Sequence, residues 1–305
     1  MTLADLPPDT LQGQLRSQGL RLRIGPFIAR VGSSMAAIET SLATLYAHHE
    51  IEPGQDGAHF TLRVDPPRTL RRFVRRQVQV TFDGREPFLP LPWQMAAPML
   101  EAALNWCVGS FAHQFVVIHA ATLARGGRAL LMPAPPGSGK STLCAALMCR
   151  GWRLLSDEFA LLDPQTGTLQ PIPRPVALKG PSIALLRAWS PDAWLGPEVV
   201  NNEGERVAYM RPPAESVRAS TTPAVPGWIL IPKFEAGAPP TVEAMSRARA
   251  VMHLADSSFN YNLHGRIGFE RLASIADRAP CVTLRYSGLE DGVQAVDRLV
   301  AESPR

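Results

Sequence analysis

The sequence has little of what marks a secreted, membrane-spanning or nucleic-acid-binding protein. Its four cysteines form no C-x-x-C pair and have no histidine partners at zinc spacing, which argues against a disulfide framework or a structural zinc. With 31 basic and 27 acidic residues the formal charge is only +4, so bulk charge gives no reason to expect nucleic acid. The most apolar stretch, 95–124, is interrupted by polar residues and is too polar for a membrane span. We therefore expect a cytoplasmic protein.

Proline is abundant and divides the chain into short elements. Apolar periodicity in the first part of the chain predicts a small α+β domain over residues 1–92. Its predicted elements are strands within 20–31, at 59–64 and at 74–82, and a helix at 35–49.

From residue 93 to residue 305 strands and helices alternate, which is typical of an α/β domain with its ligand at the carboxyl ends of the strands. The predicted elements of this larger domain are a helix at 94–110, strands at 115–124 and 129–132, a helix at 140–150, a strand at 152–156, a hairpin at 161–170, a strand at 228–234, helices at 246–256 and 268–278, a strand at 281–286 and a helix at 289–301.

A glycine-rich segment follows the strand predicted at 129–132 and fits the phosphate-binding P-loop pattern, with Ala134 where the first glycine usually stands. Gly137 and Gly139 lack a Cβ, so the backbone can curl and point successive N–H groups at phosphate oxygens. An ordinary glycine-rich turn is the alternative interpretation. The residues predicted to bind ATP are Ala134, Pro135, Pro136, Gly137, Ser138, Gly139, Lys140, Ser141 and Thr142.

Two side chains of this segment have distinct predicted roles. Lys140 would reach the β- and γ-phosphates, and the Ser141 hydroxyl would complete the coordination shell of Mg²⁺. The chemistry expected is phosphoryl transfer with ATP and Mg²⁺.

Asp157 and Glu158 follow the strand predicted at 152–156. If a short helix returns the chain to a parallel strand adjacent to 129–132, both carboxylates reach the phosphate-binding loop. One can then accept the proton of an attacking hydroxyl while the other binds the metal. A helix N-cap or a solvated strand end remains the alternative interpretation.

His119 lies in the apolar run 116–120, where a lone histidine is more often a core residue than a functional one. Among the arginines that could clamp a phosphate we prefer Arg211, because two prolines follow it. The basic run 71–76 could dock an acidic partner, but we favour a solvated strand face.

Several of these segments together resemble the kinase domain of HPr kinase/phosphorylase, closest to the branch called HprK-related kinase A. The likeness covers about residues 115–300 and preserves the order and spacing of the motifs. The segments that carry it are Ile118–Ala120, Ala134–Thr142, Arg150–Glu158, Pro173–Gly180, Gly204–Pro213 and Ser258–Tyr261.

The resemblance implies a fold shared with phosphoenolpyruvate carboxykinases and ATP-dependent phosphorylation of a serine hydroxyl. It would make Asp157 the general base, and Glu158 with Ser141 and Asp157 the Mg²⁺ site. His119 would assist at the transferred phosphate. Lys179 falls where the bifunctional enzymes carry an arginine, so it becomes a candidate phosphate ligand.

The chain also departs from that family. Glu158 replaces a second aspartate, Ala177 replaces a glutamate, and residues 1–90 do not resemble the usual regulatory domain. Members of the branch resemble accessory kinases of peptide-modification or exosortase-type gene clusters. The expected acceptor is therefore a small carrier protein or a precursor peptide. A homo-oligomer is compatible with the sequence, which leaves the oligomeric state open.

Two other functions also fit the motifs. A small-molecule kinase of the shikimate or gluconate type also places an aspartate on the strand after the P-loop helix, but it continues into a helix where this sequence predicts the hairpin 161–170. A nucleotide-sensing adaptor would bind ATP without turnover and would be stabilised by it.

Overall fold

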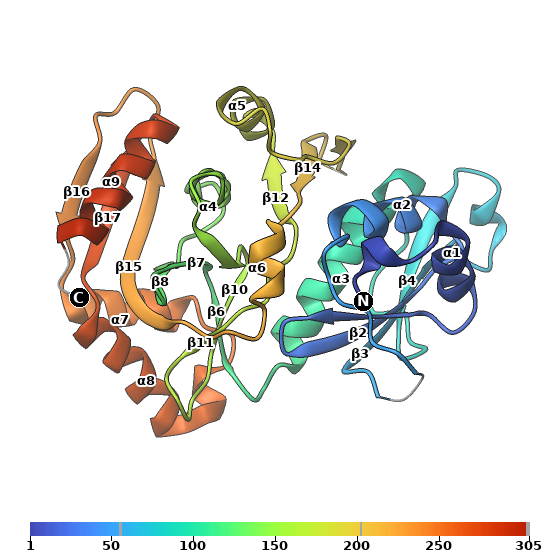
Figure 1. The fold of residues 1–305 in the computed structure, drawn as a ribbon, viewed down its shortest axis with the longest axis horizontal. Coiled ribbons are helices and arrows are strands. Elements are labelled where there is room, and N and C mark those ends of the chain that lie inside the picture. The colour runs from blue at the N-terminus through green and yellow to red at the C-terminus, as the bar shows by residue number, and fades with distance from the viewer. Residues whose placement is uncertain (55–56, 202, 303–305) are drawn as a thin grey trace.

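The protein has a mixed α/β fold (Figure 1). The structure, a computed structural model, describes residues 1–54, 57–201 and 203–302. Within these ranges no helix is both long and apolar enough to cross a membrane. The coarse α/β prediction is confirmed, whereas the division at residue 92 stays a prediction.

The N-terminal part of the chain forms a sheet in the strand order β1-β2-β3-β4-β5. Every second side chain of β1 and β3 is buried, as the two-residue period of a strand requires when one face is covered. Three helices bury apolar side chains in the same core. The elements are β1 (Leu20–Ile24), β2 (Phe27–Gly32), β3 (Phe60–Asp65), β4 (Gln77–Phe82), β5 (Leu91–Pro92), α1 (Pro8–Arg16), α2 (Ala36–Leu45), α3 (Ala96–Phe111) and the 3₁₀ turns Leu3–Asp5, Leu70–Arg72 and Trp93–Met95.

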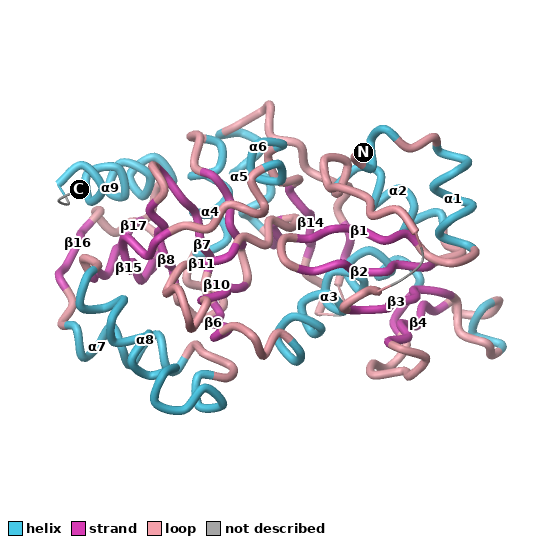
Figure 2. Tube along the Cα trace, turned by 60° about the horizontal axis from the view of Figure 1, so that its bottom comes forward, coloured by secondary structure: helices cyan, strands magenta, loops and turns pink. Residues whose placement is uncertain are grey.

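A second, larger sheet has the order β16-β17-β15-β8-β7-β9, with β8, β15 and β17 parallel. Side chains of β8 alternate between two cores: Leu130 and Met132 pack with α4 and α9, and Ala129 and Leu131 pack with α7 and α8. Helices therefore cover both faces (Figure 2). The elements are β7 (Ala121–Arg125), β8 (Arg128–Met132), β9 (Arg153–Ser156), β15 (Val225–Phe234), β16 (Thr241–Ala244), β17 (Cys281–Tyr286), α4 (Lys140–Cys149), α7 (Arg247–Asp256), the 3₁₀ turn Tyr261–His264, α8 (Gly265–Arg278) and α9 (Leu289–Glu302).

Two smaller sheets complete the fold. In the first, of order β11-β10-β6, Val117 and Leu161 join the N-terminal core while Ile118 and Leu162 join the core under α7 and α8, so this sheet connects the two. The second, of order β12-β14-β13, packs against α4. The elements are β6 (Val116–His119), β10 (Phe159–Leu162), β11 (Leu169–Gln170), β12 (Val176–Lys179), β13 (Val199–Val200), β14 (Arg206–Met210), α5 (Pro181–Trp189) and α6 (Ala214–Arg218).

Three predictions about strands were wrong in part. The strand expected at 115–124 breaks at Ala120, so that β6 and β7 lie in different sheets. The strand β9 is not adjacent to β8, because the hairpin at 125–128 puts β7 on one side of β8 and β15 occupies the other. The run 71–76 is no strand face, since β4 begins only at Gln77. The hairpin at 161–170 is confirmed as β10 and β11.

His49 follows α2 and provides a test of the packing between the N-terminal part and the loop after β11. Its side chain is buried, and Nε2 donates to the carbonyl oxygen of Pro173 at 2.8 Å. Burial lowers the pKa of the ring from 6.5 to about 4, because a charged imidazole loses its hydration there. The folded protein therefore keeps His49 neutral at a pH where the unfolded chain protonates it.

We expect His49→Gln to flatten the acid side of the stability curve. Stability from the neutral ring is complete above pH 6.5 and is lost as the pH falls toward 4, by about 2 kcal/mol between pH 7 and pH 5. Glutamine does not titrate and keeps an N–H donor. Urea unfolding at the two pH values, for both proteins, measures the difference. Equal pH slopes would contradict the assignment.

Candidate active site

Three segments meet at one edge of the larger sheet. The register pairs Ala121 with Met132 and Thr122 with Ser156, so the start of β7 lies beside the ends of β8 and β9. This happens because β7 runs antiparallel to both neighbours. The residues just before β7, after β8 and after β9 therefore lie close together, and they include His119, the glycine-rich loop 133–139 and Asp157.

The glycine-rich loop joins β8 to α4, which begins at Lys140, so the predicted strand and helix on either side of it are confirmed. Gly137 and Gly139 have φ values of +82° and +87°. The loop is attached to β17 and β15: the Tyr286 hydroxyl donates to the carbonyl oxygen of Gly139 at 3.0 Å, and the Phe234 N–H donates to that of Ser138 at 2.9 Å. The loop thus has a fixed shape.

Within this segment exposure varies from residue to residue. Ala134 is buried, Pro135, Pro136 and Gly137 are exposed, and Ser138, Gly139, Ser141 and Thr142 are half-buried. The first turn of any α-helix leaves N–H groups without intrahelical partners and carries a partial positive charge. At the start of α4 this turn lies next to an exposed loop, which is the arrangement that receives phosphate groups in proteins.

Lys140 and His119 form the central contact of this edge. Lys140 is only 6% exposed, and its Nζ lies 2.8 Å from Nε2 of His119. Burial lowers the pKa of both groups, and Lys140 lowers that of His119 further. Two cations cannot share this distance, so the more basic lysine keeps its proton and donates to a neutral imidazole. The other ring nitrogen, Nδ1, lies 3.6 Å from a carboxylate oxygen of Glu158.

Asp157 and Glu158 form the turn between β9 and β10, and the Ser156 hydroxyl holds this turn by accepting the N–H groups of Glu158 and Phe159 at 3.2 and 3.0 Å. Asp157 is 4% exposed, and neither of its carboxylate oxygens has a hydrogen-bond partner of good geometry among the described residues, although the Ser141 hydroxyl and the Cys144 thiol lie close enough to lower its pKa. Burial and the neighbouring Glu158 raise the pKa of Asp157 to about 7, against the opposing effect of Lys140. A buried carboxylate without partners is costly, which is typical of a functional group.

Ser141, Asp157 and Glu158 are also the residues that would hold Mg²⁺. Within the described residues no group of three or more His, Cys, Asp or Glu side chains forms a ready metal site. Mg²⁺ usually keeps waters and phosphate oxygens as ligands and needs only one or two carboxylates from the protein. The unpartnered oxygens of Asp157 beside Glu158 fit that requirement.

Behind the carboxylates lies a polar cluster that sequence reasoning missed. Arg174 donates to a carboxylate oxygen of Glu101 at 3.1 Å, and the Tyr46 hydroxyl donates to the same carboxylate at 2.7 Å. All three side chains are buried, and burial raises the pKa of Glu101 despite the nearby guanidinium. No local sequence pattern indicates this cluster, because its members come from the residue after α2, from α3 and from the loop after β11, which lie far apart in the sequence.

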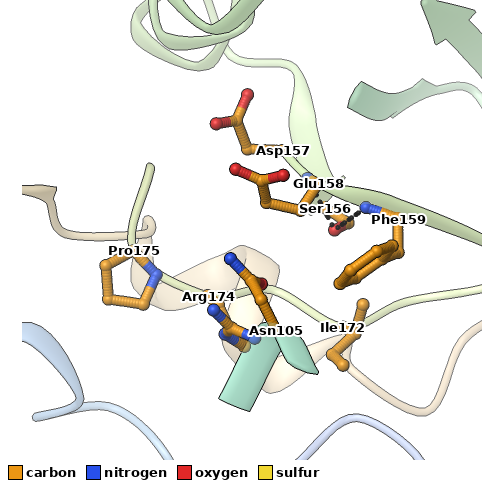
Figure 3. Close-up of a pocket in the computed structure, with 8 residues that line it drawn as sticks. All are labelled: Asn105, Ser156, Asp157, Glu158, Phe159, Ile172, Arg174 and Pro175. Carbon is orange, nitrogen blue, oxygen red and sulfur yellow. Dashed lines mark hydrogen bonds between the residues drawn. The ribbon is translucent and has the colours of Figure 1, made fainter. Parts of the chain in front are cut away.

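A small cavity separates this cluster from the carboxylate turn (Figure 3). Its volume is about 10 Å³, enough for roughly one water molecule. Asn105 and Arg174 line it, and Asn105 Oδ1 and Arg174 Nε have no hydrogen-bond partner among the described residues. Two such polar atoms beside a space of this size fit one bridging water.

Two other candidates lie apart from this contact. Lys179 is exposed at the end of β12, where its backbone bonds to Ser182. The Arg211 guanidinium lies 5.2 Å from the centre of the Trp194 ring, and its charge lowers the pKa of His48 in the N-terminal part, after the effect of burial. Their roles as phosphate ligands stay predictions.

No family model matches the chain, and no curated protein matches it. Among solved structures, a match is the HPr(Ser) kinase/phosphatase from Coxiella burnetii, at 14% identity. The match covers 61% of this chain and 99% of that one, with a TM-score of 0.28, which is too low to carry an inference about this chain. The function proposed below therefore rests on the geometry of the site together with the sequence motifs.

The two glycines of the loop give a matched test of its shape. A Cβ on Gly139 would lie 2.5 Å from the Tyr286 hydroxyl oxygen and 3.0 Å from Phe234 Cβ, whereas a Cβ on Gly137 meets nothing within 4 Å. Both substitutions bear the cost of a left-handed backbone, about 1 kcal/mol. We expect Gly139→Ala to lose at least about 1 kcal/mol more than Gly137→Ala in urea unfolding, because the bond from Tyr286 breaks as well. Equal losses would show that the loop is not packed as described.

Proposed function

We propose that this chain is an ATP- and Mg²⁺-dependent phosphotransferase that moves the γ-phosphate to a serine hydroxyl of a protein or peptide, by a mechanism related to that of HPr kinases. The observation that carries the proposal is the buried Asp157 carboxylate, which has no hydrogen-bond partner of good geometry among the described residues and lies at the same sheet edge as Lys140 at the start of α4. Phosphoryl transfer needs this combination of a cation for the phosphates and a base for the acceptor.

Loop 133–139 and the first turn of α4 would bind the phosphates of ATP. Their N–H groups supply hydrogen-bond donors, and Lys140 supplies a positive charge whose attraction for phosphate is stronger in a site shielded from water. His119 accepts a hydrogen bond from Lys140, which restricts the ammonium group to one position. Because His119 is neutral in this contact, it orients Lys140 without adding a competing charge.

Mg²⁺ would be held by Ser141, Glu158 and Asp157, as the sequence predicts. When bound, it neutralises charge on the phosphate oxygens. The chain's own residues supply the rest of the chemistry, which is the removal of a proton and the placement of the acceptor.

Asp157 would act as the general base. As the acceptor oxygen forms its bond to the γ-phosphorus, the bond from phosphorus to the β,γ-bridging oxygen breaks and ADP leaves. The hydroxyl proton passes to the Asp157 carboxylate. Burial raises the pKa of Asp157 above its usual range, which makes this carboxylate a stronger base than an exposed aspartate.

The proposal favours a protein or peptide acceptor over a small molecule for two reasons. The motif resemblance implies a serine on a protein, and the chain continues after Asp157 into the hairpin β10–β11, where kinases of the shikimate or gluconate type continue into a helix. Free serine and sugar acids tested beside peptides would separate these acceptor classes. A nucleotide-binding adaptor would instead show thermal stabilisation by ATP with no ADP formed.

Removing the lysine tests the phosphate-binding part of the proposal. We expect Lys140→Ala to lower the rate of phosphate transfer about 10²- to 10³-fold, because one fixed charge on the transferred group is lost. The substrates would be small proteins encoded beside this gene, and intact mass would report phosphate on the acceptor. A variant that transfers phosphate at the wild-type rate would exclude this role for Lys140.

Removing the base tests the chemical step with a matched control. Asp157→Asn should lower the rate about 10²- to 10⁴-fold while ATP still stabilises the protein against heat. Asp192→Asn makes the same change at an exposed aspartate outside the site and should leave the rate unaltered. The idea fails if both variants transfer phosphate equally well.

A further inference from the structure

The connection between β3 and β4 has an unusual surface, and nothing in the proposed phosphoryl transfer uses it. Residues 66–76, called the arginine-rich loop below, contain five arginines and no acidic residue. Three large apolar side chains of the same loop are exposed: Leu70 by 80%, Phe73 by 71% and Val74 by 64%. Charge of one sign and exposed apolar groups thus occur within a few positions of each other.

The local backbone puts these apolar groups together. Thr69 caps the 3₁₀ turn by accepting the N–H of Arg71, and the N–H groups of Phe73 and Val74 both donate to the carbonyl oxygen of Leu70 at 3.0 Å. Residues spaced by three and four positions in such a turn lie on one side of it. Leu70, Phe73 and Val74 therefore form one apolar side, and the arginines between and beside them flank it.

The base of the loop is held in place, so the loop projects with a defined shape. The Arg76 guanidinium lies 3.6 Å from the centre of the Trp93 ring, and Gln77 pairs with Pro92 at the start of β4. The loop lies at the end of the molecule opposite to α9 (Figures 1 and 2). It is well away from the candidate active site at the start of α4, so a partner bound there would leave that site open.

The chemistry of this surface selects its partner. Five arginines attract a dense negative charge, and three exposed apolar side chains need an apolar layer directly beneath that charge. Peptides are usually recognised in a groove or along a strand edge. As far as the structure describes this loop, it contains no strand, and the two cavities described, one at Asp157 and one between β16 and α9, are lined by other residues. An anionic lipid surface supplies both layers without a groove.

We propose that the arginine-rich loop docks this protein on anionic membrane surfaces, with Leu70, Phe73 and Val74 entering the interface and the flanking arginines contacting lipid phosphates. Interfacial binding of this kind combines apolar burial with attraction to anionic headgroups. It is reversible and weakens with salt, because the charge attraction is screened.

Co-sedimentation of the full chain with vesicles tests this directly. We expect binding to vesicles of phosphatidylcholine mixed with phosphatidylglycerol, and little binding to pure phosphatidylcholine. Arg71→Gln with Arg72→Gln should weaken partitioning about thirtyfold, since each arginine near such a surface contributes about a fivefold gain. Leu70→Ser with Phe73→Ser should weaken it at least about tenfold. All four side chains are exposed, so the variants should keep the fold.

Two matched pairs of substitutions control for the loss of charge and for the loss of exposed apolar side chains elsewhere on the surface. Arg16→Gln with Arg278→Gln removes the same charge from exposed helix positions, and Leu263→Ser with Phe269→Ser removes exposed apolar groups near and on α8. Both pairs should bind vesicles as the wild type does. Equal losses in loop and control variants would overturn the proposal.

A tryptophan reporter tests for penetration. Phe73→Trp should show extra quenching by lipids with brominated acyl chains, compared with the wild-type tryptophans. Absence of extra quenching would contradict insertion. Preferred binding to poly-glutamate or to duplex DNA, without binding to vesicles, would assign the surface to an acidic protein or to nucleic acid and would refute the membrane proposal.

Discussion

The position of one antiparallel strand determines the geometry of the candidate site. Because β7 runs between β8 and β9 and opposite to both, its first residue lies level with the last residues of its two neighbours. The chain crosses between sheets at this level twice, once through His119 and Ala120 and once through Asp157 and Glu158. Each crossing leaves polar residues where regular pairing stops. The hairpin at 125–128 sets the register of β7 against β8. It therefore determines which residues meet at the site, although it lies at the opposite end of these strands.

Burial gives these polar residues their chemical character. Lys140 and Asp157 are both almost fully enclosed, and each has its pKa displaced toward the neutral form by loss of hydration. In such an environment charges interact strongly, so a negatively charged ligand would meet little competing solvent. The contact between Lys140 and His119 is favourable only with the imidazole neutral, which links the protonation of one group to that of the other.

Local features were predictable from the sequence, and non-local ones were not. The strand, the glycine-rich loop and the helix from β8 to α4 follow one another, so composition and periodicity were enough to find them. The strand that pairs with β9 could not be predicted locally. β7 lies on one side of β8, and β15, far along the chain, occupies the other side, so β9 cannot pair with β8. The basic run 71–76 was expected to be a solvated strand face, but a 3₁₀ turn forms at Leu70–Arg72 and β4 begins only at Gln77. Arg174 gave no signal, because its partner Glu101 lies 73 positions away.

The cluster of Tyr46, Glu101 and Arg174 has a consequence for how this protein can change over evolutionary time. It joins three remote stretches of chain through one enclosed ion pair, and a buried guanidinium left without its carboxylate is strongly destabilising. Exchanging about the first hundred residues for an unrelated module would leave the Arg174 guanidinium buried without its carboxylate, unless Arg174 changed in the same event. Recombination at this point is therefore constrained, and the N-terminal part should be inherited together with the sheet that carries the candidate site.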